Sequence, residues 1–465
     1  MLYPLSYRGV APSSYSLSPL TRRGGATSTL LAVASFSHST GATDCVAKRL
    51  LPETSTVLSN GHLSIGGCDV VALSHEYGTP LFIYDETHLR NRCREAVAAF
   101  GEGVAYASKA FLCRAMATLA LEEGMCLDVA TAGEMHTALA AGAPGERIIL
   151  HGNNKSVGEL ERALEVNVRR IVIDSNDEID RLEQLVSPER PANVLVRVTP
   201  GIEAHTHEFI KTGQEDTKFG LSIASGAANA ALHRLAAIPH VTVRGVHAHI
   251  GSQVFDVDSF GKAAEILAAF VVPLGLEELC IGGGLGVAYL NDEHAPTIAQ
   301  WATAVHDALH AAGLPDDVSV TAEPGRSIAA QAAVTIYRVG TIKELPGIRT
   351  YMAVDGGMSD NPRPVLYGAG YEVFDPEDVN AERPRAVRIV GKHCESGDVI
   401  IPEGRLPAGI GVESLIATPV TGAYGYSMAS TYNKVPRPPV VFVANGEARV
   451  VIRRENLDDL LVLDA

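Results

Sequence analysis

A regular alternation of short apolar runs with helical patterns is the feature that most constrains the fold of this chain. The intervals between the runs hold Ala/Leu/Glu-rich segments, such as residues 115–125 and 158–168, whose apolar residues recur at helical spacing. Strand–helix alternation predicts parallel βαβ units, and eight units predict a closed (β/α)8 barrel. An open, doubly wound parallel sheet is the alternative that this alternation leaves open. The eight β-branched runs occupy residues 104–108, 126–130, 147–152, 170–174, 194–199, 243–250, 279–284 and 318–325.

The pattern changes after about residue 331, where strand-like runs are punctuated by Gly and Pro and long helical patterns are missing. These runs predict a β domain, either a sandwich or a barrel. Residues 61–85 are also partly strand-like, and we expect them to join this domain from the amino side. We therefore predict an α/β fold in which a (β/α)8 barrel of the TIM type is followed by a second, mostly β domain. The proposed boundaries are 85–331 for the barrel, 49–84 with 332–465 for the β domain, and 1–48 for an amino-terminal extension.

The first 43 residues differ from the rest of the chain in composition. They contain no Asp or Glu, are rich in Ser and Thr, and carry Arg8, Arg22 and Arg23. This composition suits an organellar transit peptide, and residues 22–37 faintly resemble a secretory signal, although their apolar part is short. Upstream sequence translated from an early start codon is another alternative. We favour a disordered extension and leave it out of the fold prediction.

Length, charge and cysteine usage exclude several classes of protein. A chain of 465 residues with 46% hydrophobic and 20% charged residues is typical of a globular protein of two domains. A net charge of -16 without a basic stripe argues against nucleic-acid binding. No apolar run approaches the roughly 18 to 20 residues of a membrane span. Seven scattered cysteines without a CxxC pair suit reduced thiols, so we expect a cytoplasmic protein that acts on a small molecule.

Polar residues gather at or just beyond the carboxyl ends of the predicted barrel strands. Barrel enzymes carry their chemistry at this rim, whereas chance loop polarity would not place such varied functional groups there. The segment 200–220 is an insertion that we expect to form a loop over the rim. The rim residues are Lys109, Asp128, His151, Asn153, Asn154, Asp174, Arg197, His249, Gly282, Gly283, Gly284, Glu323 and Arg326.

Lys109 is the candidate reactive group of this rim, although a solvated surface lysine is the ordinary interpretation. Desolvation there would lower the lysine pKa and free the amine to form a Schiff base. Pyridoxal phosphate is the most common user of such a lysine, and it needs a phosphate cradle and a partner for its ring nitrogen. Residues 282–284 are three glycines whose amides could approach a phosphate, although they match neither a Rossmann motif nor a P-loop. Glu323 is the candidate partner of the ring nitrogen, against the alternative of a solvated cap.

The segment 247–253, "HAHIGSQ", places two histidines on one face of a strand. A metal pair is one interpretation, but the sequence shows no third ligand at a suitable spacing. The preferred interpretation stacks the ring of His249 on a flat cofactor and lets Ser252 donate to its phosphate. The histidines in residues 204–209, "AHTHEF", are interpreted as loop structure rather than as a metal site.

An ordered set of motifs adds a family resemblance to this interpretation. Together the motifs resemble diaminopimelate decarboxylases, pyridoxal-phosphate enzymes of the alanine-racemase-like fold, and the bacterial type in particular. The resemblance extends from about residue 60 to the carboxyl terminus, and the ordered set is far more specific than any single motif. The motifs are "YASKA" (106–110), "HGNNKS" (151–156), "EAHTHEFI" (203–210), "HAHIGSQ" (247–253), "GGGLG" (282–286), "EPGRSI" (323–328), "VDGGMSDNPRPVLYGAGYE" (354–372), "KHCESGD" (392–398) and "GAYGYSM" (422–428).

The resemblance assigns a role to each matching residue and implies no metal. Lys109 would hold pyridoxal phosphate covalently, Glu323 would face its ring nitrogen, and Cys394 would return a proton to the substrate. Cys394 and Glu395 would come from the other subunit of a homodimer with shared active sites. The implied cofactor-binding residues are Lys109, Asp128, His249, Ser252, Gly282, Gly283, Gly284, Glu323, Pro324, Gly325, Arg326 and Tyr424. The implied substrate-binding residues are Arg326, Arg363, Tyr367, Glu395 and Tyr424.

The activity implied by the resemblance is decarboxylation of meso-2,6-diaminopimelate to L-lysine and CO2, the last step of lysine synthesis. The distal end of this substrate carries a carboxylate and an ammonium, for which Arg326 or Arg363 and Glu395 supply opposite charges. An ornithine or arginine decarboxylase of the same fold would need the acid but no arginine. A non-catalytic pyridoxal-binding regulatory protein is a second alternative, and Lys109 together with Cys394 counts against it. A metal-dependent barrel hydrolase is a third, weakened by the missing third ligand.

Overall fold

The computed structural model describes residues 45–201 and 217–465. The expectations about the extension up to residue 44, about the histidines of the 204–209 segment, and about a loop over the rim within 202–216 therefore lie outside the described residues. The described residues form one compact unit, and the domain boundaries suggested by the sequence remain a prediction. None of the helices in the described ranges is long and apolar enough to span a membrane.

The predicted barrel is confirmed by a sheet of eight consecutive parallel strands, to which the short β10 (Leu221–Ser222) adds along β9. Each of the eight apolar runs of the sequence forms one of these strands. Their order in the sheet is β13-β12-β11-β9-β8-β7-β6-β5. The strands are β5 (Ala105–Ala107), β6 (Cys126–Val129), β7 (Ile148–Leu150), β8 (Arg170–Ile173), β9 (Ala192–Thr199), β11 (Val241–His247), β12 (Glu278–Cys280) and β13 (Ser319–Thr321).

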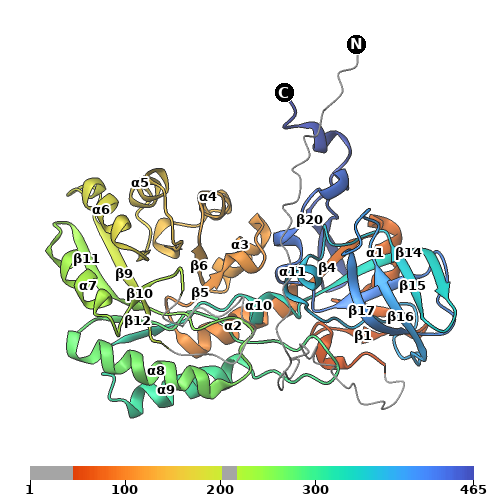
Figure 1. Ribbon diagram of the computed structural model, residues 1–465, viewed down its shortest axis with the longest axis horizontal. Coiled ribbons are helices and arrows are strands. Elements are labelled where there is room, and N and C mark those ends of the chain that lie inside the picture. The colour runs from red at the N-terminus through yellow and green to blue at the C-terminus, as the bar shows by residue number, and fades with distance from the viewer. Residues whose placement is uncertain (1–44, 202–216) are drawn as a thin grey trace, which may run out of the picture. The chain divides into compact units, whose positions relative to one another are not determined.

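Backbone hydrogen bonds bring the first and last strands of this sheet together. The amide of Ala105 donates to Ala322 O at 2.9 Å, and the amide of Ala107 donates to Pro324 O at 3.1 Å. The helices lie around the outside of the strands (Figure 1). They are α2 (Glu86–Phe100), α3 (Arg114–Glu122), α4 (Ala132–Ala140), α5 (Val157–Glu165), α6 (Asn176–Leu185), α7 (Ala227–Ala237), α8 (Val257–Val271), α9 (Ile298–Ala311) and the short α10 (Arg326–Ala329).

Side-chain alternation along the strands separates the barrel interior from the surrounding core. Successive strand residues point to opposite faces, so one set of side chains turns inward and the other packs beneath the helices. Six buried residues from six strands form a small cluster of their own, separate from the main core, and we assign them to the barrel interior. They are Ala105, Cys126, Ile149, Val172, Leu195 and Cys280.

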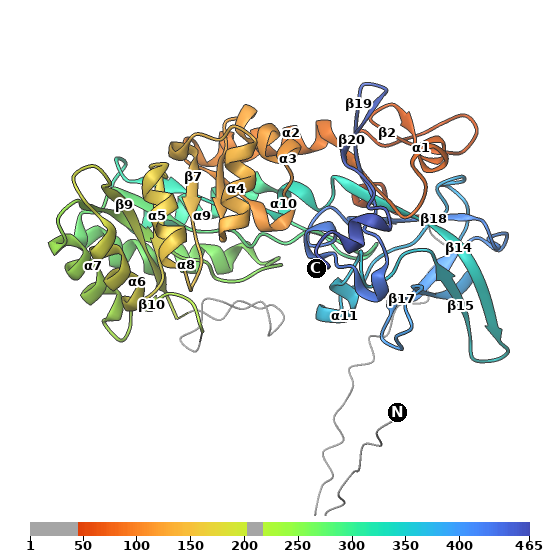
Figure 2. The same cartoon turned by 90° about the horizontal axis from the view of Figure 1, so that it is seen from above.

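The second sheet confirms a mostly β second part without long helices. Its strands run in the order β17-β16-β15-β14-β4-β19-β20, with β18 paired to β14, and they lie to one side of the barrel in both views (Figures 1 and 2). The members are β4 (Leu81–Asp85), β14 (Ala333–Leu345), β15 (Arg349–Val354), β16 (Arg385–Val390), β17 (Val399–Leu406), β18 (Leu415–Pro419), β19 (Val440–Ala444) and β20 (Glu447–Ile452), with the short helix α11 (Arg363–Tyr367) between β15 and β16.

The segment 61–85 joins this part of the fold as predicted, since the Leu63 amide donates to Pro376 O at 2.9 Å and the Gly446 amide donates to Gly66 O at 2.7 Å, but only its last strand enters the large sheet. Strand β4 lies between β14 and β19, as the strand-like pattern predicted. The preceding residues form the helix α1 (Val70–Tyr77) and a separate three-stranded sheet of β1 (Thr56–Val57), β2 (Leu63–Ile65) and β3 (Cys68–Asp69). Asp69 is the N-cap of this helix, and its carboxylate accepts the amides of Val71 and Ala72. This N-cap interrupts the strand pattern in favour of a helix.

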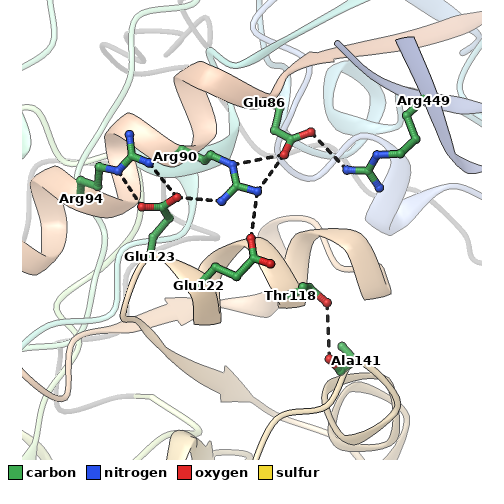
Figure 3. A network of polar contacts seen from close by, with 8 residues as sticks. All are labelled: Glu86, Arg90, Arg94, Thr118, Glu122, Glu123, Ala141 and Arg449. Carbon is green, nitrogen blue, oxygen red and sulfur yellow. Dashed lines mark hydrogen bonds and ion pairs between the residues drawn. The ribbon is translucent and has the colours of Figure 1, made fainter. Parts of the chain in front are cut away.

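A network of charges connects the first two barrel helices with strand β20 (Figure 3). Arg90 on α2 contacts Glu86 at 2.8 Å, Glu122 at 2.9 Å and Glu123 at 2.7 Å. Arg449 on β20 contacts Glu86 at 3.1 Å. Because one guanidinium serves three carboxylates and one carboxylate bridges to the second sheet, the network contributes more than an isolated surface pair would.

A buried carboxyl in the second part of the fold provides a test by pH. Asp360 accepts hydrogen bonds from the Tyr337 hydroxyl at 2.6 Å and from the Gly357 amide at 2.7 Å. Burial raises its pKa from 3.8 to about 7 in spite of these donors. The pKa of Asp360 is higher in the folded than in the unfolded protein. The stabilisation of the folded state by this group is therefore complete below pH 3.8 and is lost as the pH rises through about 7.

We expect Asp360→Asn to remove most of this pH dependence, since its oxygen can accept the Gly357 amide while its NH2 donates to the Tyr337 hydroxyl oxygen, without a titrating group. Relative to this variant, the free energy of unfolding of the wild type should fall by up to about 4 kcal/mol between pH 4 and pH 8. Urea unfolding at several pH values measures the difference. The exposed Asp458, changed to Asn, serves as the control, and parallel pH curves for wild type and Asp360→Asn would contradict the assignment.

Candidate active site

A cavity of about 780 Å³ opens at the carboxyl ends of the barrel strands. Residues of the second part of the fold, in the segment 363–370 and at Tyr424, line it together with the barrel rim. The structure thus brings most of the residues predicted from sequence to one place. The predicted site residues that line the cavity are Lys109, Asp128, His249, Ser252, Gly283, Gly284, Glu323, Gly325, Arg326, Arg363, Tyr367 and Tyr424.

Four predicted residues are not among those that line the cavity. Gly282 and Pro324 are buried directly beside lining residues. Cys394 and Glu395 are exposed and lie on the loop between β16 and β17. A site within one chain therefore lacks these two side chains.

Lys109 follows the first barrel strand in a single 3-10 turn, Ser108–Ala110. Its neighbours Ser108 and Ala110 are buried, but Lys109 itself is exposed at the cavity. Within the described chain Lys109 is thus not desolvated, and its desolvation by a bound ligand remains a prediction. The turn explains this exposure, because it points one side chain away from the core while it anchors both neighbours. The amine is accessible to a ligand in the cavity.

The glycines after β12 allow close approach of backbone segments at the rim. A Cβ on Gly283 would lie 2.2 Å from Glu323 O, and one on Gly284 would lie 2.1 Å from Gly251 O. Gly284 also has φ of +113°, which side-chain-bearing residues rarely adopt. The amide of Gly283 donates to His249 Nδ1 at 3.1 Å, which fixes the orientation of that ring. Their role in holding a phosphate remains a prediction.

Glu323 is buried and is held by two histidines from distant parts of the barrel. His151 Nε2 lies 2.8 Å from Oε1, and His247 Nε2 lies 3.0 Å from Oε2. Burial alone would raise the pKa of Glu323, but the two histidines outweigh burial and hold it well below its ordinary value. The group is an ionised acceptor at neutral pH.

The pKa values of the two histidines shift in opposite directions although both contact the same carboxylate. Burial lowers the pKa of His247 to about 4. Burial also acts on His151, but Asp128 and Glu323 outweigh it and raise the pKa of this histidine. Asp128 Oδ1 lies 3.8 Å from His151 Nε2, and burial raises its own pKa to about 6. Because an ionised carboxylate only accepts hydrogen bonds, each histidine is assigned a proton on Nε2 and donates a hydrogen bond to Glu323.

This arrangement corrects the sequence argument about metal ligands. The sequence showed no third ligand for the histidine pair, yet donor atoms of His151, His247 and Glu323 all lie within 4.8 Å of one another. The partner of His247 is thus His151 rather than His249, which turns its Nδ1 to the Gly283 amide. The hydrogen bonds within the cluster are those of two histidines that hold the Glu323 carboxylate in position.

Two arginines face the cavity without an acidic partner among the described residues. Arg326 donates to the Tyr289 hydroxyl and to Ser252 Oγ, both at 2.8 Å, and its buried Nε has no hydrogen-bond partner in the described structure. Arg363 is 5% exposed; its Cζ lies 4.1 Å from the ring centroid of Tyr289, and its Nη1 donates to the Tyr371 hydroxyl. Buried guanidinium groups of this kind bind carboxylates or phosphates.

The loop that carries Cys394 is fixed at both ends. The Asp398 carboxylate accepts the amides of Met358 at 2.7 Å and His393 at 2.8 Å. Asn433 Oδ1 lies 3.3 Å from the Cys394 amide and accepts its hydrogen bond. The exposed thiol is therefore held on an anchored loop.

Sequence reasoning missed the roles of His247 and Tyr289. His247 could have been found, because it ends a barrel strand two residues before His249, and residues at this spacing point to the same face. Tyr289 had no comparable signal, since it lies in an irregular segment whose position depends on Glu293. The Glu293 carboxylate accepts the amides of Tyr289 at 2.7 Å and Leu290 at 3.1 Å.

Comparison with known proteins agrees with this geometry. A family model described as "Pyridoxal-dependent decarboxylase, pyridoxal binding domain" matches residues 86–330. A diaminopimelate decarboxylase of Mycobacterium tuberculosis is 49% identical over 440 residues, covering 90% of this chain and 98% of that protein. The Bacillus subtilis diaminopimelate decarboxylase is 44% identical over 430 residues, covering 88% and 97%.

Solved structures show the same similarity in three dimensions. The diaminopimelate decarboxylase of M. jannaschii in co-complex with L-lysine has a TM-score of 0.82 and 31% identity, covering 89% of this chain and 98% of that chain. The Helicobacter pylori enzyme complexed with L-lysine has a TM-score of 0.77 and 30% identity, covering 85% and 99%.

The barrel, the second sheet and the rim cavity define a pyridoxal-phosphate-dependent decarboxylase with an alanine-racemase-like fold. Within this class, the chain belongs to the diaminopimelate decarboxylase family. The family resemblance inferred from the ordered motifs is thereby confirmed.

The residues present at the rim fit pyridoxal phosphate. An accessible amine, an ionised buried carboxylate and a side-chain-free glycine segment line one cavity. The buried Arg326 Nε without a partner adds a donor that suits an anionic ligand.

Proposed function

We propose that this cavity decarboxylates meso-2,6-diaminopimelate to L-lysine and CO2. The observation that carries the proposal is the pair of buried guanidinium groups, Arg326 and Arg363, without carboxylate partners in the described chain, in the same cavity as Lys109 and Glu323. A dicarboxylate substrate with a phosphorylated cofactor supplies the anions that such a pair requires.

Lys109 and Glu323 carry the chemistry in this proposal. When bound, pyridoxal phosphate supplies an electron-accepting ring that takes up the electrons left when CO2 departs. The ionised Glu323 carboxylate keeps a proton on the ring nitrogen, since a neutral ring would be a weaker acceptor. Lys109 would hold the cofactor through its amine, which lies exposed at the cavity. His249, whose Nδ1 accepts the Gly283 amide, would pack against the face of the cofactor ring.

Substrate choice rests on the arginines and on an acid. Arg363 is fixed between Tyr289 and Tyr371, so its planar fork is oriented before a carboxylate arrives. Tyr367 and Tyr424 line the cavity beside it. Ornithine and arginine, the substrates of the alternative decarboxylases, have no distal carboxylate that could neutralise this buried cation.

The exposed position of Cys394 and Glu395 supports a site shared between two subunits. Lys109 and Tyr424 also line an adjoining hollow of about 510 Å³ that includes Leu112 and Met428. In a homodimer the anchored loop of one chain would enter the site of the other. Its thiol would return the proton to the α carbon, and Glu395 would bind the distal ammonium.

A substrate panel tests the proposed activity. Purified protein supplied with pyridoxal phosphate should release CO2 from meso-diaminopimelate and yield L-lysine, with kcat/KM at least about 100-fold above that for ornithine or arginine, because only the first substrate has a distal carboxylate. Release of CO2 from ornithine or arginine but not from diaminopimelate would reject the proposal.

A further inference from the structure

The Glu323 carboxylate is held more completely than a cofactor contact alone would require. Each of its two oxygens accepts from a different imidazole, at 2.8 Å from His151 and 3.0 Å from His247. The three residues are 6%, 7% and 1% exposed, in the order Glu323, His151 and His247. The residues follow or end β13, β7 and β11, so three separate strands must converge to form the cluster.

The two imidazoles also fix each other. Their ring centroids lie 4.9 Å apart at an interplanar angle of 68°, an edge-to-face contact. His247 Nδ1 is buried without a hydrogen-bond partner among the described residues, which leaves Nε2 as its single donor and aims the ring at Glu323. A carboxylate between two such donors cannot rotate without breaking a buried hydrogen bond.

We propose that His151 and His247 are positioning residues that hold the Glu323 carboxylate in the one orientation in which it accepts from the cofactor's ring nitrogen. The inference rests on the proposed role of Glu323. Each oxygen of a carboxylate has two lone pairs, so one imidazole on each oxygen leaves acceptor capacity for a further donor. The pair contributes through orientation and charge, and neither histidine needs to touch the substrate.

The alternative is that the histidines only fill space in the barrel. The two explanations predict different losses of binding for a cofactor with and without its ring nitrogen. If the histidines act through Glu323, their loss weakens binding of pyridoxal phosphate more than binding of its deaza analogue, in which C–H replaces the ring nitrogen. If they only fill space, binding of both compounds weakens equally.

The experiment titrates cofactor-free full-length protein with both compounds and measures each Kd by absorbance. His151→Leu and His247→Leu should weaken pyridoxal phosphate binding roughly 10- to 100-fold more than analogue binding, the loss expected for a hydrogen bond to a charged group. His247→Gln, which can place an amide N–H near the Nε2 position, should restore most of the difference. His151→Gln should restore part of the difference in the same way, because its amide N–H can also lie near the Nε2 position.

His88→Leu is the matched control, since His88 is equally buried at 3% exposure but accepts the Glu53 amide away from the cavity. This variant should leave the ratio of the two Kd values unchanged. Equal losses of both compounds in the His151 and His247 variants, or no loss in either, would overturn the proposal. If the leucine variants do not fold, His151→Asn and His247→Asn replace them in the same comparison, because the shorter amide cannot reach the Nε2 position, and an unchanged ratio of the two Kd values in both contradicts the proposal.

Glu323→Gln separates this inference from the proposed function. A selective loss of pyridoxal phosphate binding in Glu323→Gln, without one in the histidine variants, rejects only the positioning role. No selective loss in Glu323→Gln rejects the assignment of Glu323 itself.

Discussion

Replacing Lys109 with alanine is expected to lower kcat for diaminopimelate by roughly 10³- to 10⁵-fold. Among the described residues, Lys109 is the only lysine that lines the cavity. Its position after β5 also makes the amine accessible to a ligand, so the variant should fold normally and lose chemistry rather than structure. The measurement is single-turnover CO2 release, together with the absorbance of the bound cofactor before and after borohydride reduction.

The control for this result is Lys218→Ala, which removes an exposed lysine near the rim whose Nζ lies 5.0 Å from the Phe219 ring centroid. It should leave the rate nearly unchanged. A small primary amine added to Lys109→Ala should recover part of the activity, because it replaces the missing amine. Retention of more than a few per cent of activity without added amine would exclude Lys109 as the cofactor-bearing residue.

The second large effect is expected when two inactive variants are mixed. Lys109→Ala and Cys394→Ala should each be nearly inactive alone. After subunit exchange, half of the dimers are mixed, and each mixed dimer has one site that combines an intact Lys109 with an intact Cys394 from the partner subunit. Activity should therefore rise to about a quarter of the wild-type value.

A matched mixture uses two residues of the same cavity. Lys109 and Glu323 line one cavity within a single chain. A mixture of Lys109→Ala with Glu323→Gln should thus recover nothing, because every site retains one defect. Equal recovery in both mixtures, or none in the first despite subunit exchange shown by mass spectrometry, would refute the shared site.

The barrel was predictable because its signals are local. The runs that became β5 and β6 are apolar and β-branched, and the segments between them have helical spacing, so each element is specified by its own residues. The rim residues were predictable for a similar reason, since parallel strands end at one edge. The helix α1 was missed because a single capping residue, Asp69, changed the structure of a strand-like segment.

The sequence by itself determined the eight strands, the position of Lys109 at a strand end and the ordered motifs of the family. Only the tertiary structure decided that Lys109 is exposed and that His151 and His247 meet on Glu323, whereas the family resemblance had already implied that Cys394 serves the other subunit's site. The physical reason is that local patterns fix which face a side chain occupies. Which side chains meet across a barrel depends on how distant strands close, and that closure is a property of the whole fold.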